Sequence, residues 1–390
     1  MTRRTRTFGL AAAALVACGG PPPAPREYPR INDTSEASSA PAEREPLRDG
    51  PVMVVRRDSS PIVTLRVVFE AGSAADGEGR EGLTNLTARL MAEGGAGELS
   101  YAELTRRLYP MAASIDVHVG RDQTAFVGQV HRDHLEDFYE LFRDVLLRPR
   151  MSEEDFVRVR DQARNALVVE LRSADDEELG KEALQAMIYA DHPYGHPALG
   201  TEAGLARIRV DDVRAQRSRV FCAGRAIVGV AGDFPEGFDE RVRRDVARLS
   251  SDACVGREAL PEPAQASAPR VLIVRKPSAQ AVAVSMGFPI EVERDDPDYP
   301  ALVLAAAYLG QHRQFVGRLM QEIRGKRGLN YGDYAYAEAF EQEGWGTYAR
   351  TNTARRQQAF TVWIRPVVPE HRLFAIRAAQ HVLQRYVDEG

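Results

Sequence analysis

The stretch VMVVRRDSSPIVTLRVVFEAGS, residues 52–73, decides the fold because a second version of it occurs later in the chain. That second version is VLIVRKPSAQAVAVSMGFPIEV, residues 271–292. Each copy has an apolar run, a charged turn and a second apolar run, which predicts two strands joined by a turn. The first five residues of the two copies exchange only apolar side chains and share an arginine, Arg56 and Arg275.

Each copy is followed by an acidic turn and an apolar helix, EGLTNLTARLMAEG in the first half and DYPALVLAAAYLG in the second. The repeat predicts an α+β protein of two homologous α/β units, each an antiparallel sheet flanked by helices. We place the first unit at 51–257, a linker rich in Pro and Ala at 258–269 and the second unit at 270–390. The second unit is the shorter, and we expect it to be truncated, without its final part.

Composition limits the function. The chain has 390 residues, of which 44% are hydrophobic and 27% charged, as in ordinary globular proteins. Its formal net charge is −5 at pH 7. A dedicated nucleic-acid-binding protein carries a basic excess, so we expect no nucleic-acid partner.

The N-terminus has the parts of a secretory signal, with three arginines followed by an apolar run from Phe8 to Ala17. About ten apolar residues are too few for a helix that crosses a bilayer, which needs ~20. The run ends in LVACG, residues 15–19, which resembles the bacterial lipobox and makes Cys18 the lipidated residue. The alternative is a plain secretory signal with an incidental cysteine.

We therefore predict a lipoprotein signal peptide at 1–18. Residues 19–50 are rich in Pro, Ser, Ala and charge, which predicts a disordered tether. The expected location is the periplasm, where a lipid attached to Cys18 would anchor the protein to a membrane. Gly19 is not aspartate, which slightly favours the outer membrane by resemblance to enteric sorting.

Two further cysteines, Cys222 and Cys254, are 32 residues apart in a chain expected in a compartment that permits disulfides. They are either bonded to each other or two unrelated small core residues. Sequence alone does not set the geometry, so both possibilities stay open.

Five stretches, taken in order, resemble the family of pitrilysin, insulin-degrading enzyme and mitochondrial processing peptidase, which are zinc metallopeptidases. The resemblance covers about residues 51–390. The stretches are FEAGSAADGEGREGL (69–83), DVLLRPRMSEEDF (144–156), HPYGHPALGT (192–201), AIVGVAGDF (226–234) and IRGKRGLNYGDYAY (323–336).

In active members of that family, the first helix carries an inverted zinc motif, H-x-x-E-H, whose histidines hold zinc while the glutamate activates water. The resemblance places Asn85, Ala88 and Arg89 at those positions, and Glu170 at the position of the third ligand. The zinc site is therefore degenerate. Ala88 cannot accept a proton, Asn85 offers only a neutral carbonyl oxygen, and Arg89 puts a cation where the metal would be.

From these replacements we expect no catalytic residue, no bound zinc and no peptide cleavage by the chain alone. We also predict a salt bridge between Arg89 and Glu170 in place of the metal. The alternative is that residues 85–89 never had a role and form a solvated face. Two close histidine pairs, His131 with His134 and His192 with His196, lack a helical base and are not expected to bind a catalytic metal.

Arg324 and Tyr331 of IRGKRGLNY match an Arg/Tyr pair which, in the family, reaches a substrate bound to the other half. A guanidinium and a phenol can both donate to a developing oxyanion, so we predict that these residues bind substrate. The alternatives are a surface arginine and a cross-strand aromatic. Arg327 is a nearby substitute for Arg324.

Some bacterial members of the family are split into one chain with the zinc helix and another with the Arg/Tyr pair. The resemblance therefore implies a non-catalytic, substrate-binding subunit of a periplasmic zinc metalloendopeptidase pair, whose partner is a homologous active subunit with H-x-x-E-H and whose substrates are unfolded or short peptides. Zinc is expected only in that partner. The alternative is a non-enzymatic binding or scaffold protein of the same fold, like core subunits of respiratory complexes. An active peptidase with unrecognised ligands is the third reading.

Overall fold

The computed structural model describes residues 46–249, 252–264, 266, 268–277, 279–341, 346–347 and 353–389. The predicted signal peptide, Cys18 and most of the predicted tether lie outside the described residues. Within the described ranges, no helix is both long enough and apolar enough to cross a membrane.

Five strands form the first sheet: β1 (Val52–Arg57), β2 (Ile62–Phe69), β3 (Ser114–Val119), β4 (Thr124–His131) and β5 (Ala226–Gly232). Their order is β1-β5-β2-β4-β3, in which β1 and β5 are parallel and all other neighbours antiparallel. Along β2, buried residues alternate with partly exposed ones. Successive side chains of a strand point to opposite faces, so one face of this sheet belongs to the core.

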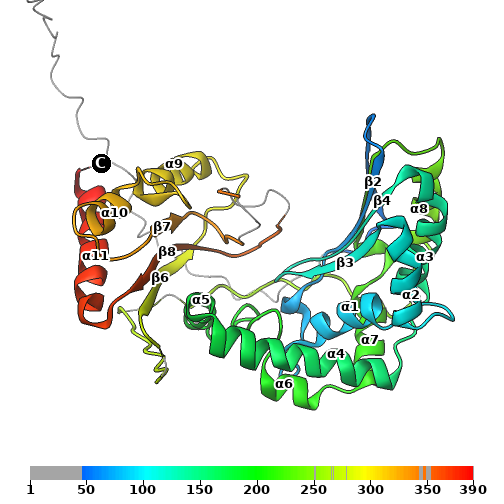
Figure 1. Cartoon of the computed structure of the whole chain (residues 1–390), viewed down its shortest axis with the longest axis horizontal. Coiled ribbons are helices and arrows are strands. Elements are labelled where there is room, and N and C mark those ends of the chain that lie inside the picture. The colour runs from blue at the N-terminus through cyan, green and yellow to red at the C-terminus, as the bar shows by residue number, and fades with distance from the viewer. Residues whose placement is uncertain are drawn as a thin grey trace, which may run out of the picture. The chain divides into compact units, whose positions relative to one another are not determined.

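Helices pack on that buried face (Figure 1). At the start of α4 (Glu153–Asn165), Ser152 accepts a hydrogen bond from the backbone N–H of Asp155 and three acidic residues occupy the first turn, which is a favourable start for a helix. A π-helix, Ala166–Ala174, continues α4. The helices are α1 (Leu83–Glu93), α2 (Tyr101–Leu108), α3 (Leu135–Leu147), α4 (Glu153–Asn165), α6 (Glu202–Arg207), α7 (Val210–Val220) and α8 (Phe238–Val246).

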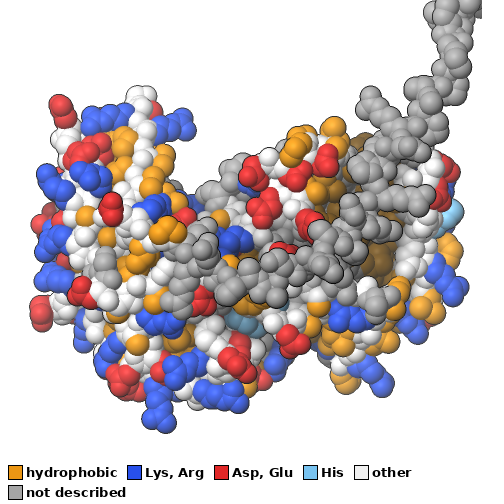
Figure 2. Space-filling view, turned by 180° about the vertical axis from the view of Figure 1, so that it is seen from behind, with side chains coloured by type: hydrophobic (Ala, Val, Ile, Leu, Met, Phe, Trp, Pro, Cys, Tyr) orange, Lys and Arg blue, Asp and Glu red, His pale blue; other side chains and the backbone are white. Residues whose placement is uncertain are grey.

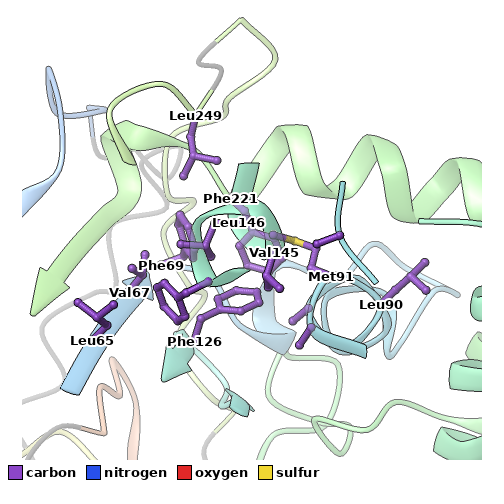
Figure 3. Packing of buried hydrophobic residues seen from close by; sticks show 14 of the residues in the cluster. Leu65, Val67, Phe69, Leu90, Met91, Phe126, Val145, Leu146, Phe221 and Leu249 are labelled. Atoms are coloured by element: carbon purple, nitrogen blue, oxygen red, sulfur yellow. The ribbon is translucent and has the colours of Figure 1, made fainter. Parts of the chain in front are cut away.

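Aromatic side chains fill the centre of this core (Figure 3). The ring centroid of Phe69 on β2 lies 6.0 Å from that of Phe126 on β4 and 5.1 Å from that of Phe221 after α7. All three are buried, and each contributes on the order of 1.5–3 kcal/mol by leaving water. Beside this core, Cys222 and Cys254 form a disulfide with 6.1 Å between their Cα atoms, which answers the question left open by the sequence.

Three antiparallel strands form the second sheet, β6 (Val282–Ile290), β7 (Asp333–Tyr336) and β8 (Gln358–Val367), in the order β6-β8-β7. One face packs against α9 (Tyr299–Gly310), the short α10 (Arg318–Met320) and α11 (Arg372–Glu389) in a second core. The prediction of an α+β fold with sheets flanked by helices is confirmed. The second sheet is antiparallel as predicted, whereas the first sheet also contains one parallel pair, β1 with β5.

The other face of the second sheet contacts α5 (Asp176–Ile188), a helix from the first half of the chain. The Nζ atom of Lys181 lies 3.7 Å from the ring centroid of Trp363 on β8. Leu184 packs beside Gly287 on β6. The predicted unit boundaries at 257 and 270 stay predictions.

One predicted strand is absent. Residues 271–275, the counterpart of β1, have neither helical nor strand structure, and the side chains of residues 271–274 are exposed. In the first sheet, β1 pairs only with β5. No strand equivalent to β5 is present in the described part of the second half, so residues 271–275 have no partner for backbone hydrogen bonds.

Candidate functional site

The first candidate region is α1, which begins at Gly82 in the left-handed conformation with φ 104°. The carboxylate of Asp76 accepts 2.7 Å hydrogen bonds from the backbone N–H groups of Gly82 and Thr84, so it satisfies two of the free donors at the helix start. Burial raises the pKa of the Asp76 carboxyl. The helix is therefore fixed at the end where the sequence placed the degenerate zinc motif.

Asn85 and Ala88 lie inside the protein. Their relative exposures are 7% and 0%. The Oδ1 atom of Asn85 is buried and has no hydrogen-bond partner among the described residues. The alternative of a solvated face at residues 85–89 is thus wrong, because α1 is buried on nearly every side between α4, α7 and the sheet.

Arg89 does not pair with Glu170, and that prediction is wrong. Its Nε and Nη2 atoms donate to the two carboxylate oxygens of Glu93, at 2.9 and 3.1 Å, and Nη2 lies 3.4 Å from Oε1 of Gln162 on α4. Glu93 is one turn along the same helix, within easy reach of a long side chain. A partner across the helices is therefore not needed.

Glu170 is exposed in the π-helix, away from the buried stripe of Val159, Ala163 and Leu167 that α4 and its extension add to the core around α1. A π-helix has a wider turn than an α-helix, so side-chain directions shift within it. Glu170 lies eight residues after Gln162, which reaches Arg89, and eight residues span roughly 12 Å along an α-helix. The structure does not bring Glu170 to the motif positions.

The residues at the motif positions do not fit zinc. One is a buried methyl group, one an amide and one a cation held by Glu93, and no carboxylate from the neighbouring helix completes a ligand set. Within the described ranges there is no group of three or more His, Cys, Asp or Glu side chains placed to hold a metal.

Both histidine pairs serve local structure. Nδ1 of His131 accepts from the backbone N–H of Asp133, and Nδ1 of His192 accepts from that of Tyr194. Nδ1 of His196 lies 2.9 Å from the carbonyl oxygen of Pro197.

The second candidate region lies between the π-helix Gln321–Gly325 and β7. Here the structure brings the predicted Arg324 and Tyr331 together. The Cζ atom of Arg324 lies 5.0 Å from the ring centroid of Tyr331 and 4.9 Å from that of Phe315. This is cation–π distance, which holds the guanidinium between two aromatic rings.

Tyr331 is 61% exposed, and its hydroxyl makes no hydrogen bond within the described part of the chain. The Nη1 atom of Arg324 is buried and also lacks a hydrogen-bond partner there. Two donors, a phenol and a guanidinium, are thus adjacent and uncommitted. That arrangement is capable of donating to an oxygen of a bound ligand.

Arg327 is not a substitute for Arg324. Its Nη1 atom lies 3.2 Å from a carboxylate oxygen of Glu322, and its Cζ atom lies 5.5 Å from the ring centroid of Phe374 on α11. Arg327 thus has its own partners, Glu322 and Phe374, and does not take the place of Arg324 beside Tyr331.

Asp333 is a residue of this region that the sequence analysis missed. It is fully buried at the start of β7, where Nδ2 of Asn330 donates a 2.6 Å hydrogen bond to its Oδ1. Its Oδ2 has no hydrogen-bond partner among the described residues. Burial raises the pKa of Asp333 to about 7, although the hydrogen bond from Asn330 and the charge of Arg324 both lower it. An acid two residues after Tyr331 was the only signal in the sequence.

A second guanidinium flanks Tyr331 from β8. The Cζ atom of Arg365 lies 5.6 Å from the Tyr331 ring centroid, and its Nε donates to Glu177 of α5 at 3.1 Å. The tyrosine ring is therefore held between two arginines, while Glu177 balances the charge of one. On the face shown in Figure 2, by contrast, Lys and Arg side chains are interspersed with Asp and Glu.

Comparisons with known proteins match nearly the whole described chain. Residues 52–202 match the family described as insulinase (peptidase family M16), and residues 207–364 match the family described as the peptidase M16 inactive domain. A solved structure titled as a peptidase M16 inactive domain from Pseudomonas fluorescens superimposes with a TM-score of 0.73 at 24% identity, over 90% of this chain and 80% of that one.

Two curated relatives have names that bear on catalysis. The non-peptidase homolog YmxG of Helicobacter pylori is 23% identical over 73% of this chain and 64% of its own length. The mitochondrial cytochrome b-c1 complex subunit 1 of Caenorhabditis elegans is 25% identical over 50% of this chain and 41% of its own length. The chain thus spans less than two thirds of the length of these relatives.

Proposed function

Because the chain belongs to the insulinase family, peptidase family M16, we propose that it is a non-catalytic, substrate-binding subunit of a periplasmic zinc metalloendopeptidase pair. The observation that carries the proposal is the contrast between α1, whose motif positions do not fit zinc, and the stacked Arg324 and Tyr331. A chain that has the Arg/Tyr pair but no zinc motif would complement a chain that has the zinc motif.

In this pair, the partner supplies the metal and the general base through an intact H-x-x-E-H helix. This chain supplies the two donors. The phenol of Tyr331 and the guanidinium of Arg324 bind a carbonyl oxygen of an extended peptide and stabilise the negative charge that develops on it. Aromatic packing around Arg324 fixes the direction of its planar fork before the substrate arrives.

The proposed location follows from the N-terminus. Lipidation of Cys18 anchors the protein to a membrane, with the outer membrane favoured, and residues 19–50 separate the folded part from the bilayer. The disulfide between Cys222 and Cys254 is compatible with an oxidising compartment.

A scaffold role is the second candidate, favoured by the relative named as a cytochrome b-c1 complex subunit. A scaffold needs the fold but has no use for two uncommitted donors beside each other. Whether Arg324 and Tyr331 contribute to peptide hydrolysis in an assembled complex therefore distinguishes the two functions.

The experiment is to co-express the chain with an M16 chain of similar size that has H-x-x-E-H and is encoded beside it. Assembly is measured by size-exclusion chromatography with light scattering, and hydrolysis is followed with an unstructured quenched-fluorescence peptide. The proposal predicts a stable heterodimer and little hydrolysis by either chain alone. A partner that is fully active without this chain, or that does not associate with it, would contradict the proposal.

A further inference from the structure

Arg121, in the turn between β3 and β4, is a buried cation whose hydrogen bonding is incomplete. Its side chain is only 4% exposed, and its Nη2 atom donates a 2.8 Å hydrogen bond to Oε2 of Glu182 on α5. Its Nη1 atom is buried and has no hydrogen-bond partner among the described residues. A guanidinium has five N–H donors and keeps its charge in a protein, so a buried one requires groups that accept hydrogen bonds.

A second arginine, Arg355 before β8, acts on the same place. Burial lowers the pKa of Arg121, and the positive charge of Arg355 lowers it further, whereas Glu182 raises it. The Nε atom of Arg355 is buried and has no hydrogen-bond partner within the described part of the chain. Two cations thus share one acid, Glu182, which leaves an excess of one positive charge at a largely buried place.

Asp122, the next residue of the turn, does not balance this excess. Its Oδ1 atom accepts hydrogen bonds from Nε and Nη2 of Arg356, at 3.0 and 2.8 Å. Its Oδ2 atom accepts from the hydroxyl of Tyr194 and from the backbone N–H of Arg356. Arg257 lies 3.9 Å from the same carboxylate. Glu293, another acid near this cluster, interacts with Arg257 and Arg356. Asp122 is therefore committed to cations of its own.

Two buried tyrosines form a wall beside the two arginines. The Cζ atom of Arg355 lies 5.5 Å from the ring centroid of Tyr194, and that centroid lies 5.3 Å from the ring centroid of Tyr189. The charges of Arg121 and Arg355 both act on Tyr189. Arg355 and Glu182 are only partly buried, so they form the side of this place that is open to solvent.

We propose that Arg121 and Arg355 form a binding site for one carboxylate group of a ligand. A single negative charge neutralises the excess, and the planar fork of a guanidinium matches the two oxygens of a carboxylate. Nη1 of Arg121 is the buried donor, Arg355 is the donor on the solvent side, and Glu182 keeps Nη2 of Arg121. The site shares no residue with the pair of Arg324 and Tyr331, and it does not depend on the proposed function.

The carboxylate belongs either to the C-terminus of a peptide or to a small acid in solution, and calorimetric titration of the full chain distinguishes these sources. The probes are the tripeptide N-acetyl-Gly-Ala-Ala with a free C-terminus, the same tripeptide as its C-terminal amide, and sodium acetate. We expect a carboxylate probe to bind at one site, and the free tripeptide at least about tenfold more tightly than the amide if peptides are the source. Binding of acetate instead assigns the site to small acids.

One variant tests the location without changing the buried arginine. Arg355→Gln removes the cation on the solvent side and is expected to weaken carboxylate binding about tenfold or more. Because it also removes a like charge beside Arg121, the ligand-free variant should unfold at the wild-type Tm or above it. Arg107→Gln, at an exposed arginine of α2, is the matched control and should change neither binding nor Tm.

Three results would overturn the proposal: no difference between the two tripeptides together with no binding of acetate, unchanged carboxylate binding by Arg355→Gln, or a lower Tm of the ligand-free Arg355→Gln chain. The last result would mean that Arg355 serves folding rather than a ligand. Tighter binding of sulfate than of any carboxylate probe would also contradict the proposal, because a dianion exceeds the single charge to be neutralised.

Discussion

Helix α1 and the segment from Arg324 to Asp333 differ in how their candidate functional side chains are buried and partnered. In α1, the positions that matched catalytic groups are either buried in the core or held by a neighbour on the same helix. In the later segment, Tyr331 is exposed and stacked on an arginine, beside a buried acid with an unsatisfied oxygen. The positions in α1 are thus part of the packed core, whereas the later segment presents an exposed tyrosine beside an arginine.

The residues at the motif positions of α1 are stable without a metal. Ala88 leaves no proton acceptor and fits a core position without strain, so packing stabilises the replacement. Arg89 is neutralised by Glu93 one turn away. Buried polar atoms without a hydrogen-bond partner among the described residues occur in both regions, at Oδ1 of Asn85 in α1 and at Nη1 of Arg324 and Oδ2 of Asp333 in the later segment.

The largest expected effect comes from restoring the acid to α1. Ala88→Glu buries a carboxyl group in a position with no exposure, and we expect a loss of about 3–5 kcal/mol in unfolding free energy. Urea unfolding followed by circular dichroism measures it. Ala102→Glu, the same change on the exposed face of α2, is the control and should stay within about 0.5 kcal/mol of wild type. An equally harmless Ala88→Glu would mean that α1 still has room for a catalytic acid.

Asp333 gives the second prediction. Its pKa is about 7 in the folded protein, above the usual 3.8, so folding favours its neutral form. The stability this provides is fully present below about pH 4 and is lost as the pH rises through 7. Asp333→Asn, which stays neutral, should therefore match wild type below about pH 4, exceed it increasingly between pH 4 and 7, and exceed it at pH 8 by at most about 4 kcal/mol.

The measurement is Tm across that pH range, with Asp298→Asn at an exposed position as the control. A difference between Asp333→Asn and wild type that does not change with pH would show that Asp333 is not held as a neutral acid.

The smallest effect concerns the pair that occupies the motif position. Glu93→Ala removes the i,i+4 partner of Arg89 and is expected to cost only about 0.3–0.5 kcal/mol. Glu389→Ala, which breaks the similar pair with Arg385 on α11, gives the reference value. A loss of several kcal/mol in unfolding free energy for Glu93→Ala, but not for Glu389→Ala, would contradict this. It would mean that the folding of α1 depends on a counter-charge for Arg89.

The α+β fold could be predicted because the repeat at 52–73 and 271–292 marks corresponding strands in the two halves, β2 and β6. The strand predicted at 271–275 is wrong, because an apolar pattern indicates a strand but does not supply the neighbouring strand with which it would pair. The predicted Arg89–Glu170 salt bridge is wrong for two reasons. Alignment by residue number does not account for the π-helix, which changes the direction in which the Glu170 side chain points, and Glu93 lies nearer to Arg89. Arg324 and Tyr331 were found from the resemblance to the family's Arg/Tyr pair, and Asp333 was missed because its burial is a tertiary property.

The most direct test of the contrast between the two regions is kcat/KM for peptide hydrolysis by the assembled pair. Tyr331→Phe keeps the ring beside Arg324 and removes only the hydroxyl, so its loss isolates the proposed donor. Tyr308→Phe, at another exposed tyrosine on α9, is the matched control. We predict that Tyr331→Phe assembles normally and loses about 10²–10³ in kcat/KM, as for other single oxyanion donors, while Tyr308→Phe loses nothing. Wild-type kcat/KM in the Tyr331→Phe pair would contradict the shared site.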